Sequence, residues 1–402
     1  MNAPLADLFL RPGADRRLRA GHVWVYSNEI DTERSPLSGF AAGDLVAVRK
    51  ADGALLGSAY MEPQALICAR LYAIGHAQAL DTLWLQALLV RALAGREALF
   101  AAPYYRLVYG DSDGIPGLVV DRFGPYLVLQ FHNAGIECYE AEIVQALVVL
   151  LQPSGILLRA DNRSRREQGL KDRVEVVFGE VPAEVPLQEN GVAFLAPVVE
   201  GQKTGWFYDH RLARARLADY APGKRVLDVY SYLGGWGIQA AMSGASSVCC
   251  IDSSARALDG VLANALLNDV GDKVSVLQGS AAETLQTLHK QGARFDLVIL
   301  DPPAFIQRRK DIKKGIKAYQ RINELALNLL EPDGVLISGS CSMHLARADL
   351  MAALQGAARR SGCEVRVLEQ GGQGPDHPVH PLIPETDYLK SVFVRKLSPA
   401  GI

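Results

Sequence analysis

Four side chains that could take part in chemistry lie at the ends of apolar segments in the C-terminal half of the chain. They are Asp228, Asp252, Asp301 and Cys341, and the segments span 225–229, 247–251, 295–300 and 334–338. Carboxylates accept hydrogen bonds from hydroxyl and amino groups, and an ionised thiol is a nucleophile. In an open α/β sheet, ligands lie beyond the carboxyl ends of the strands, so we expect these four side chains to meet there.

The segment after the first of these strands predicts a turn that approaches a nucleoside. It contains Gly234, Gly235 and Gly237, which allow the backbone to come close to a ligand. An acidic residue after the next strand, here Asp252, can accept hydrogen bonds from both hydroxyls of a ribose. The glycines do not follow the strict G-x-G-x-x-G pattern, so a simple packing turn is the alternative interpretation. The residues predicted to bind a cofactor here are Asp228, Ser231, Gly234, Gly235, Asp252 and Ser253.

The segment 295–300 runs into Asp301-Pro302-Pro303-Ala304-Phe305, which has the form of the D/N-P-P-aromatic motif of class I methyltransferases. Two prolines make the loop rigid, so that Asp301 and main-chain carbonyls can meet a planar base while Phe305 offers a stacking surface. The alternative is that Pro302 and Pro303 only stiffen a loop. We predict that Asp301 contacts the cofactor and the base, with Pro302, Pro303 and Phe305 at the base.

Basic residues follow this motif closely. Between 308 and 317 there are six basic side chains against one acidic side chain, and the basic ones are Arg308, Arg309, Lys310, Lys313, Lys314 and Lys317. Such a cluster can neutralise RNA phosphates around a target base, although a charge run is often only a solvated face. Its place beside the Asp-Pro-Pro-Phe loop favours RNA contact through Arg308, Arg309 and Lys310.

Three regions with different patterns are expected to position these residues. Short β segments punctuated by glycines predict a small barrel over 1–75, in which 18–26 and 43–48 resemble a PUA domain, a compact RNA-binding β-barrel. A helix over 80–99 followed by strand-like segments predicts an α+β middle domain over 76–186. Apolar strands alternating with helices predict a parallel sheet buried on both faces, in a Rossmann-like α/β domain over 187–402.

The composition is typical of a globular protein. The chain has 402 residues, of which 49% are hydrophobic and 21% charged, and this length suits two or three domains. No apolar stretch reaches the roughly 20 residues that a bilayer needs, and the N-terminus lacks the pattern of a secretion signal, so we expect a cytoplasmic protein. A net charge of −2 does not by itself mark a nucleic-acid binder.

The cysteines and histidines do not predict a metal site. The six cysteines form no C-x-x-C pair, and thiols are the default in a reducing compartment. Two histidines, His377 and His380, stand three residues apart, but a zinc site needs two further ligands and the flanking prolines oppose a helix. We therefore predict no metal.

Seven residue strings occur in one order along the chain. They are GHVWV at 21–25, IPGLVVDR at 115–122, GQKTG at 201–205, SYLGG at 231–235, DPPAF at 301–305, SCS at 340–342 and YLK at 388–390. In this combination they resemble the RlmI family of 23S ribosomal RNA cytosine 5-methyltransferases. That family joins an N-terminal PUA domain, an α+β middle domain and a class I methyltransferase domain.

The resemblance implies S-adenosylmethionine as the cofactor, with Asp252 on its ribose and the turn 231–237 beside its methionine portion. Gln202 and Thr204 would line the same site, and Lys203 would face an anionic group such as the cofactor carboxylate or an RNA phosphate. A solvated lysine is the alternative for Lys203. Many relatives place an acidic residue against the adenine where this chain has Gly-Ser-Ala-Ala at 279–282, and Ser280 is the contact expected there.

The resemblance also implies methylation of carbon 5 of a cytosine in 23S rRNA, or in a precursor of the large subunit. Cys341 would form a covalent adduct with the base, and Asp301 would hydrogen-bond the base and stabilise the adduct. Methylation of a base nitrogen is the nearest alternative, because it uses a similar Asp-Pro-Pro-Phe motif and needs no cysteine. A noncatalytic RNA-binding assembly factor is a third hypothesis. A homodimer is one assembly compatible with the sequence.

Overall fold

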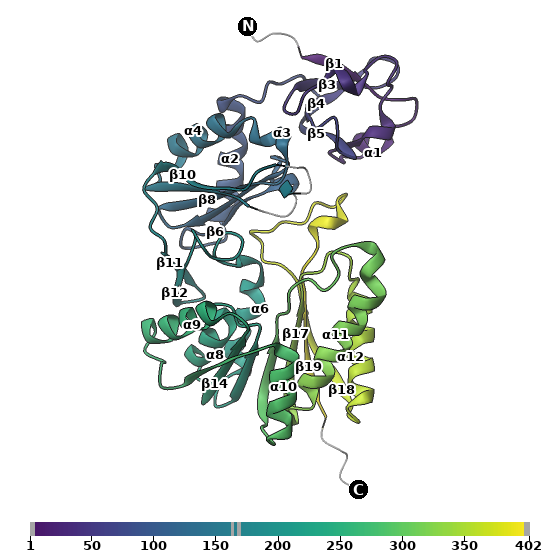
Figure 1. The fold of residues 1–402 in the computed structure, drawn as a ribbon. Coiled ribbons are helices and arrows are strands. Elements are labelled where there is room, and N and C mark those ends of the chain that lie inside the picture. Colours follow the sequence, from purple (N-terminus) through teal and green to yellow (C-terminus); the bar gives the residue numbers. More distant parts are fainter. Residues whose placement is uncertain (1–4, 162–164, 167–169, 398–402) are drawn as a thin grey trace. The chain divides into compact units, whose positions relative to one another are not determined.

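The computed structural model describes residues 5–161, 165–166 and 170–397, and Figure 1 shows its ribbon. The chain forms two compact units, and each unit takes more than one stretch of sequence. Unit 1 comprises Met1–Val185, Pro197–Trp206 and Pro375–Thr386, and unit 2 comprises Pro186–Ala196, Phe207–Gly374 and Asp387–Ile402. Two short later segments, Pro197–Trp206 and Pro375–Thr386, therefore fold with the N-terminal stretch Met1–Val185. The domain boundaries at residues 75 and 186 stay predictions.

The N-terminal part of unit 1 is a five-stranded sheet in the order β1-β3-β4-β5-β2. Its elements are β1 (Ala6–Phe9), α1 (Arg16–Arg19), β2 (Trp24–Tyr26), β3 (Leu45–Arg49), β4 (Leu55–Met61) and β5 (Ile67–Ile74). β1 pairs in parallel with β3, and the other pairs are antiparallel. Gly57 permits close approach of β4 to β5, because a Cβ there would lie 2.1 Å from the carbonyl oxygen of Ala73. Buried Val25, Val46 and Ala59 belong to its core.

A second five-stranded sheet in unit 1 has the order β10-β9-β8-β7-β6. Its elements are α2 (Thr82–Glu97), β6 (Tyr104–Tyr109), β7 (Leu118–Phe123), β8 (Tyr126–Phe131), α3 (Ala134–Glu137), α4 (Glu140–Leu151), β9 (Gly155–Ala160) and β10 (Arg173–Gly179). Only β8 and β9 pair in parallel. Asp81 caps α2, because its carboxylate accepts a hydrogen bond from the backbone N–H of Trp84 at 2.9 Å. Leu85 and Leu89 of α2 pack with Ile143 of α4 in one core.

Unit 2 contains a seven-stranded sheet in the order β15-β14-β13-β16-β17-β19-β18. Its strands are β13 (Arg225–Val229), β14 (Ser247–Asp252), β15 (Val274–Gln278), β16 (Phe295–Leu300), β17 (Leu330–Ser340), β18 (Val365–Gly371) and β19 (Lys390–Lys396). The five strands β13 to β17 are parallel, whereas β19 is antiparallel to both β17 and β18. A hairpin, β11 (Val185–Glu189) and β12 (Val192–Ala196), forms a separate two-stranded sheet.

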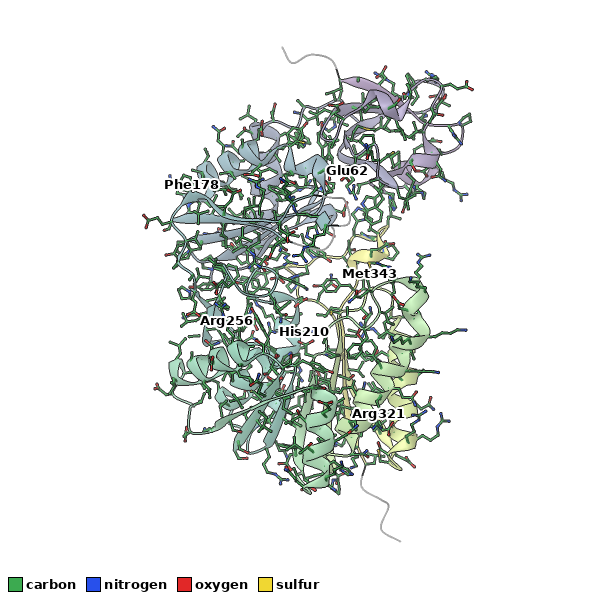
Figure 2. All side chains as sticks on the ribbon, viewed as in Figure 1. Glu62, Phe178, His210, Arg256, Arg321 and Met343 are labelled. Atoms are coloured by element: carbon green, nitrogen blue, oxygen red, sulfur yellow. The ribbon has the colours of Figure 1, made fainter. Side chains whose placement is uncertain are left out.

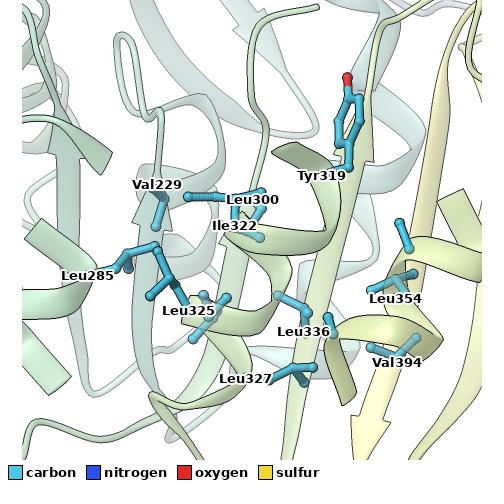
Figure 3. Packing of buried hydrophobic residues seen from close by; sticks show 14 of the residues in the cluster. Val229, Leu285, Leu300, Tyr319, Ile322, Leu325, Leu327, Leu336, Leu354 and Val394 are labelled. Carbon is cyan, nitrogen blue, oxygen red and sulfur yellow. The ribbon is translucent and has the colours of Figure 1, made fainter. Parts of the chain in front are cut away.

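Helices connect and cover these strands. They are α6 (Arg211–Ala215), α7 (Leu217–Tyr220), α8 (Gly235–Met242), α9 (Ala255–Leu267), α10 (Ala281–Lys290), α11 (Ile312–Leu327) and α12 (Arg347–Arg360). Figure 3 shows the core in which Leu285 of α10, Leu325 of α11 and Leu354 of α12 pack against Val229, Leu300 and Leu336 of the sheet. Burying each such side chain contributes roughly 1.5 to 3 kcal/mol, so this core holds the strand ends in fixed places.

The fold predicted from the sequence is confirmed. The helix expected over 80–99 is α2, and the apolar segments of the C-terminal half are the parallel strands β13 to β17. The antiparallel pair β18 and β19 was not predicted, because its strands carry no local signal of direction. Among the described residues, no helix has both the length and the apolar character needed to cross a membrane.

Candidate active site

The residues singled out by the sequence lie at the carboxyl ends of four adjacent strands. In the order β14, β13, β16 and β17, Asp252 ends its strand, Asp228 is the last but one residue, and Asp301 and Cys341 each follow directly. The register pairs Leu300 with Ser338, so Asp301 and Cys341 leave neighbouring strands at nearly the same level. The structure thus brings these four residues to one edge of the sheet.

The turn after β13 is tightly built around Asp228. The carboxylate of Asp228 is fully buried and accepts a hydrogen bond from the backbone N–H of Gly237 at 2.8 Å. A Cβ at Gly237 would lie 2.5 Å from the sulfur of Cys250, so only glycine fits between the helix and the strand. Gly234 has φ +79, a left-handed conformation that favours glycine. These glycines therefore bring the start of α8 close to the sheet.

Two polar atoms at this turn have no hydrogen-bond partner among the described residues. They are Oδ1 of Asp228 and Oγ of Ser231, and both are buried. Burial raises the pKa of Asp228 to about 7. Buried polar groups are nearly always satisfied, so these atoms point to a polar ligand or water at the turn.

Asp252 is held as a hydrogen-bond acceptor. Its Oδ2 accepts from the backbone N–H of Tyr232 at 3.0 Å, and its Oδ1 accepts from that of Ser254 at 2.9 Å. Each carboxylate oxygen has a second lone pair, so both can still accept from the two hydroxyls of a ribose. Ser254 also caps α9 by accepting from the backbone N–H of Ala257. The strand end, the cap and the turn together fix this carboxylate.

Asp301 forms a buried cluster with His210 and Trp236. Its Oδ1 lies 3.0 Å from Nε2 of His210, and its Oδ2 accepts a hydrogen bond from Nε1 of Trp236 at 3.0 Å. The His210 and Trp236 rings are 5.4 Å apart between centroids. His210, labelled in Figure 2, ends the short helix η4 (Tyr208–His210) and is 4% exposed. A Cβ at Gly339 of β17 would lie 3.3 Å from Oδ1 of Asp301, so this glycine leaves room for the pair.

Each member of the pair stabilises the charge of the other. Burial raises the pKa of Asp301, but the charge of His210 and the hydrogen bond of Trp236 outweigh burial, and the pKa lies below its ordinary value. Burial lowers the pKa of His210, but the charge of Asp301 outweighs it, and the pKa lies above its ordinary value. At neutral pH we therefore treat the pair as imidazolium and carboxylate.

Cys341 lies in a segment held by its two serine neighbours. Ser340 donates to the hydroxyl of Tyr319 at 2.8 Å, and that hydroxyl is also 2.8 Å from Oγ of Ser342. The same Oγ accepts from the backbone N–H of Ile306 at 3.2 Å, which ties the loop after Asp301 to the segment after β17. Cys341 is partly exposed, and its Sγ lies 3.9 Å from the carbonyl oxygen of Pro302. The Ser-Cys-Ser string thus positions a thiol against the Asp-Pro-Pro loop.

The remaining predicted base and RNA contacts lie on the same loop and the helix after it. Phe305 is partly buried, with its ring 4.8 Å from that of Tyr319 and 6.5 Å from that of Tyr230. Pro302 is buried and Pro303 exposed. The basic side chains are exposed, from Arg308 to Lys310 before α11 and at 313, 314 and 317 on it. Their roles stay predictions.

The other residues predicted to bind the cofactor lie outside the turn after β13. Ser253 and Ser280 are exposed at the ends of β14 and β15. Gln202, Lys203 and Thr204 belong to unit 1, where Thr204 is buried and donates to Oδ2 of Asp121 at 2.6 Å. Their part in cofactor binding stays a prediction. In the described ranges, no group of three or more His, Cys, Asp or Glu side chains is arranged to hold a metal ion.

Four residues at this edge were not assigned a role from the sequence. They are His210, Trp236, Tyr319 and Lys390, and all are buried. The sequence did contain a signal for two of them. Trp236 stands between Gly235 and Gly237 of the glycine turn, and Lys390 is the last residue of the YLK string at 388–390. His210 and Tyr319 carry no local signal, because their partners are distant in the sequence.

Comparisons with known proteins assign families to two parts of the chain. A family described as S-adenosylmethionine-dependent methyltransferase matches residues 156–382, and a PUA-like domain matches residues 8–73. A solved structure assigned as such a methyltransferase, from Streptococcus mutans, has TM-score 0.81 at 20% identity and covers 97% of this chain and 100% of that one. A second solved structure, of a protein assigned as a methyltransferase and complexed with SAH, has TM-score 0.83 at 20% identity. It also covers 97% of this chain and 100% of that one. These two likenesses show the fold.

The family match over residues 156–382 covers more than half of the chain, so the chain is an S-adenosylmethionine-dependent methyltransferase. Ribosomal RNA large subunit methyltransferase I of Shewanella denitrificans is 34% identical over 392 residues, which cover 96% of this chain and 98% of that protein. The chain belongs to the family of ribosomal RNA large subunit methyltransferase I. The family predicted from the sequence is thus confirmed, as is S-adenosylmethionine as its cofactor.

The residues of the turn fit this cofactor. Bound S-adenosylmethionine supplies an electrophilic methyl group on a sulfonium. We expect Asp252 to hold the ribose hydroxyls, and Oγ of Ser231 and Oδ1 of Asp228 to meet polar groups of the same ligand or an ordered water. A partly protonated Asp228 can donate as well as accept there.

Asp252→Ala is expected to weaken S-adenosylmethionine binding by about 1.5 to 3 kcal/mol, because it removes a charged acceptor from the ribose. Calorimetry measures the affinity, and thermal melting checks that the turn survives the loss of two backbone contacts. Asp259→Ala is the matched control, since Asp259 is an exposed carboxylate on α9. Equal affinity for the Asp252→Ala and Asp259→Ala proteins would refute the ribose assignment.

Proposed function

We propose that this chain methylates carbon 5 of a cytosine in 23S rRNA, or in a precursor of the large subunit, in the cytoplasm. The name of its relative supports large-subunit ribosomal RNA as the substrate. The observation that carries carbon 5 as the target is the thiol of Cys341. Cys341 directly follows β17, which pairs with β16, the strand that ends just before Asp301. The Sγ of Cys341 lies 3.9 Å from the carbonyl oxygen of Pro302.

Carbon 5 of cytosine needs activation, because it is a poor nucleophile within an aromatic ring. The Cys341 thiolate supplies an electron pair that forms a sulfur–carbon 6 bond, and the displaced π electrons make carbon 5 enamine-like. Carbon 5 would then bond to the methyl group that bound S-adenosylmethionine supplies, and the bond from that methyl group to sulfur would break with its electron pair left on the sulfur. Loss of the carbon-5 proton to a base and breakage of the sulfur–carbon 6 bond restore the ring and the thiolate. The base must first be unstacked, which costs a few kcal/mol if it is paired.

The Asp301–His210 pair provides the proton that the adduct needs. As sulfur adds to carbon 6, negative charge develops on ring nitrogen 3, and protonation of that nitrogen stabilises the adduct. Asp301 is a carboxylate with an imidazolium 3.0 Å away, so the pair holds one proton. The proton is on the imidazolium of His210, so it reaches nitrogen 3 by way of the Asp301 carboxylate, which accepts it from His210 and donates it to the base. A neutral imidazole and an ionised carboxylate remain until the proton returns when the adduct breaks down.

Methylation of a base nitrogen is the second candidate. The observation that favours it is the lowered pKa of Asp301, because an ionised carboxylate accepts hydrogen bonds from an amino group, as a nitrogen methyltransferase requires. Methylation of a nitrogen would give no role to Cys341 or to the hydrogen bonds by which Ser340 and Ser342 hold its segment. Nucleoside mass spectrometry of rRNA from a strain lacking the protein separates the two. Loss of 5-methylcytidine supports carbon-5 methylation, and loss of an N-methylated nucleoside contradicts it.

The exposed basic side chains before α11 are expected to contact RNA phosphates. Changing Arg308, Arg309 and Lys310 together to Gln should weaken RNA binding. The slope of the logarithm of the binding constant against the logarithm of the salt concentration should become less steep by about 0.7 for each charge removed. The affinity for the cofactor should not change. The matched control changes Arg359, Arg360 and Arg366 to Gln, three exposed arginines on and after the C-terminal end of α12. The same salt slope in both triple variants would mean that the first cluster is only a solvated face.

A further inference from the structure

Lys390 is a buried ammonium group close to Cys341. It is the first residue of β19, it pairs in register with Ser340 of β17, and it is 5% exposed. Its Nζ donates to the carbonyl oxygen of Ser342 at 3.0 Å and to that of Tyr388 at 2.9 Å. One of the two acceptors is thus the residue that directly follows Cys341.

The two hydrogen bonds that Lys390 donates to these carbonyls do not balance its charge. Both acceptors are neutral carbonyl groups. A buried charge is expensive unless an opposite charge lies nearby. Burial lowers the pKa of Lys390, and Arg347 lowers it further, while the negative charges of Asp387 and of an ionised Cys341 act in the opposite direction. An ionised Cys341 therefore stabilises the ammonium, and the ammonium must stabilise the thiolate equally.

The surroundings of Cys341 hold this arrangement in place. Tyr319 of α11 contacts both serine neighbours of the thiol, and burial raises the pKa of this tyrosine, as does the charge of an ionised Cys341. Tyr319 is therefore a neutral hydroxyl that fixes Ser340 and Ser342. Lys390 is a positive charge that interacts with an ionised Cys341.

We propose that Lys390 is the counter-ion of the Cys341 thiolate and acts as a positioning residue for the nucleophile. The inference rests on the proposed function, which makes this thiol the nucleophile. Lys390 keeps its proton throughout the reaction. It stabilises the thiolate before sulfur adds to carbon 6 and again when the sulfur–carbon electron pair returns to sulfur. Its fixed hydrogen bonds to two carbonyls keep the charge beside the thiol rather than in solvent.

The test measures the reactivity of the thiol without RNA. Iodoacetamide modifies thiolates, so its rate with Cys341 at a series of pH values, followed by peptide mass spectrometry, gives the pH at which the thiol ionises. We expect this midpoint below the value of about 8.5 of an ordinary cysteine. Cys138, an exposed cysteine in unit 1, serves as the internal reference in each sample.

Two substitutions at Lys390 separate charge from structure. Lys390→Gln keeps a donor for the carbonyl of Ser342 but removes the charge, and it should raise the midpoint of Cys341 by about one pH unit or more. Lys390→Arg keeps the charge and should hold the midpoint near that of wild type. Equal midpoints for wild type and Lys390→Gln, with Cys138 unchanged, would overturn the proposal. Thermal melting and cofactor calorimetry confirm that each variant is folded.

This experiment also separates the inference from the proposed function. A raised midpoint in Lys390→Gln supports the counter-ion whatever the methylated atom is. If that shift is found but wild type makes no 5-methylcytidine, only the proposed function fails. If wild type makes 5-methylcytidine but the ionisation midpoint of Cys341 is the same in Lys390→Gln as in wild type, only the counter-ion proposal is contradicted.

Discussion

Replacing Cys341 with alanine is expected to reduce methyl transfer by about 10⁴-fold or more, because loss of a catalytic nucleophile removes the whole covalent route. The thiol is partly exposed and the segment is held by Ser340, Ser342 and Tyr319, so the fold and cofactor affinity should stay near wild type. Transfer of labelled methyl groups to rRNA measures the loss. Calorimetry with S-adenosylmethionine measures what is kept.

A covalent trap tests the same residue by another route. Fluorine at carbon 5 of cytosine cannot leave as a proton does, so the methylated adduct cannot break down. Wild type should therefore form a denaturation-resistant complex with RNA that carries 5-fluorocytosine at the target, and Cys341→Ala should not. Cys363→Ala is the matched control, because Cys363 is a partly buried thiol of the same unit. A fully active Cys341→Ala protein would instead favour methylation of a base nitrogen.

Asp301→Asn is expected to lower the rate of methyl transfer by about 10²- to 10⁴-fold, the range for loss of general acid–base catalysis. The amide keeps the shape of the side chain and can still accept from Nε1 of Trp236. It cannot carry the negative charge that pairs with His210, so the proton held by the pair is lost. Single-turnover transfer measures the chemical step. A rate within a few-fold of wild type would contradict the role given to the pair.

The stability of this variant should depend on pH in a defined direction. The raised pKa of His210 gives stability that is full below its ordinary value and is lost as pH rises through the raised one. The lowered pKa of Asp301 gives stability that is full above its ordinary value and is lost as pH falls through the lowered one. The deficit of Asp301→Asn in thermal melting should thus be larger at about pH 6 than at about pH 9. An equal deficit at both would mean that the pair is not ionic.

The sequence predicted the part of the site that depends on local pattern. Strand ends could be located from apolar segments, and acidic residues at those ends meet because parallel strands share their carboxyl edge. The sequence alone therefore predicted that Asp252 and Asp301 lie at this edge of the sheet, without their hydrogen-bond partners. The Pro-Pro pair marked a rigid loop, and the Ser-Cys-Ser string marked a thiol at the next strand end.

The rest depends on contacts between segments that are distant in the chain. His210 meets Asp301 only because η4 and the end of β16 come together in unit 2. Lys390 reaches Ser342 because β19 runs antiparallel to β17, and no local pattern gave the direction of β19. Histidine is intermediate in burial and lysine is mostly exposed, so the burial of His210 and Lys390 could not be predicted from residue type.

The central claim, methylation of carbon 5, is tested most directly by the fate of the hydrogen on that carbon. rRNA carrying cytosine with tritium at carbon 5 is incubated with the protein and S-adenosylmethionine, and tritium in water is compared with methyl groups transferred. Carbon-5 methylation replaces that hydrogen, so we predict release of about one tritium for each methyl group. Methyl transfer without tritium release would place the methyl group elsewhere on the RNA and contradict the account.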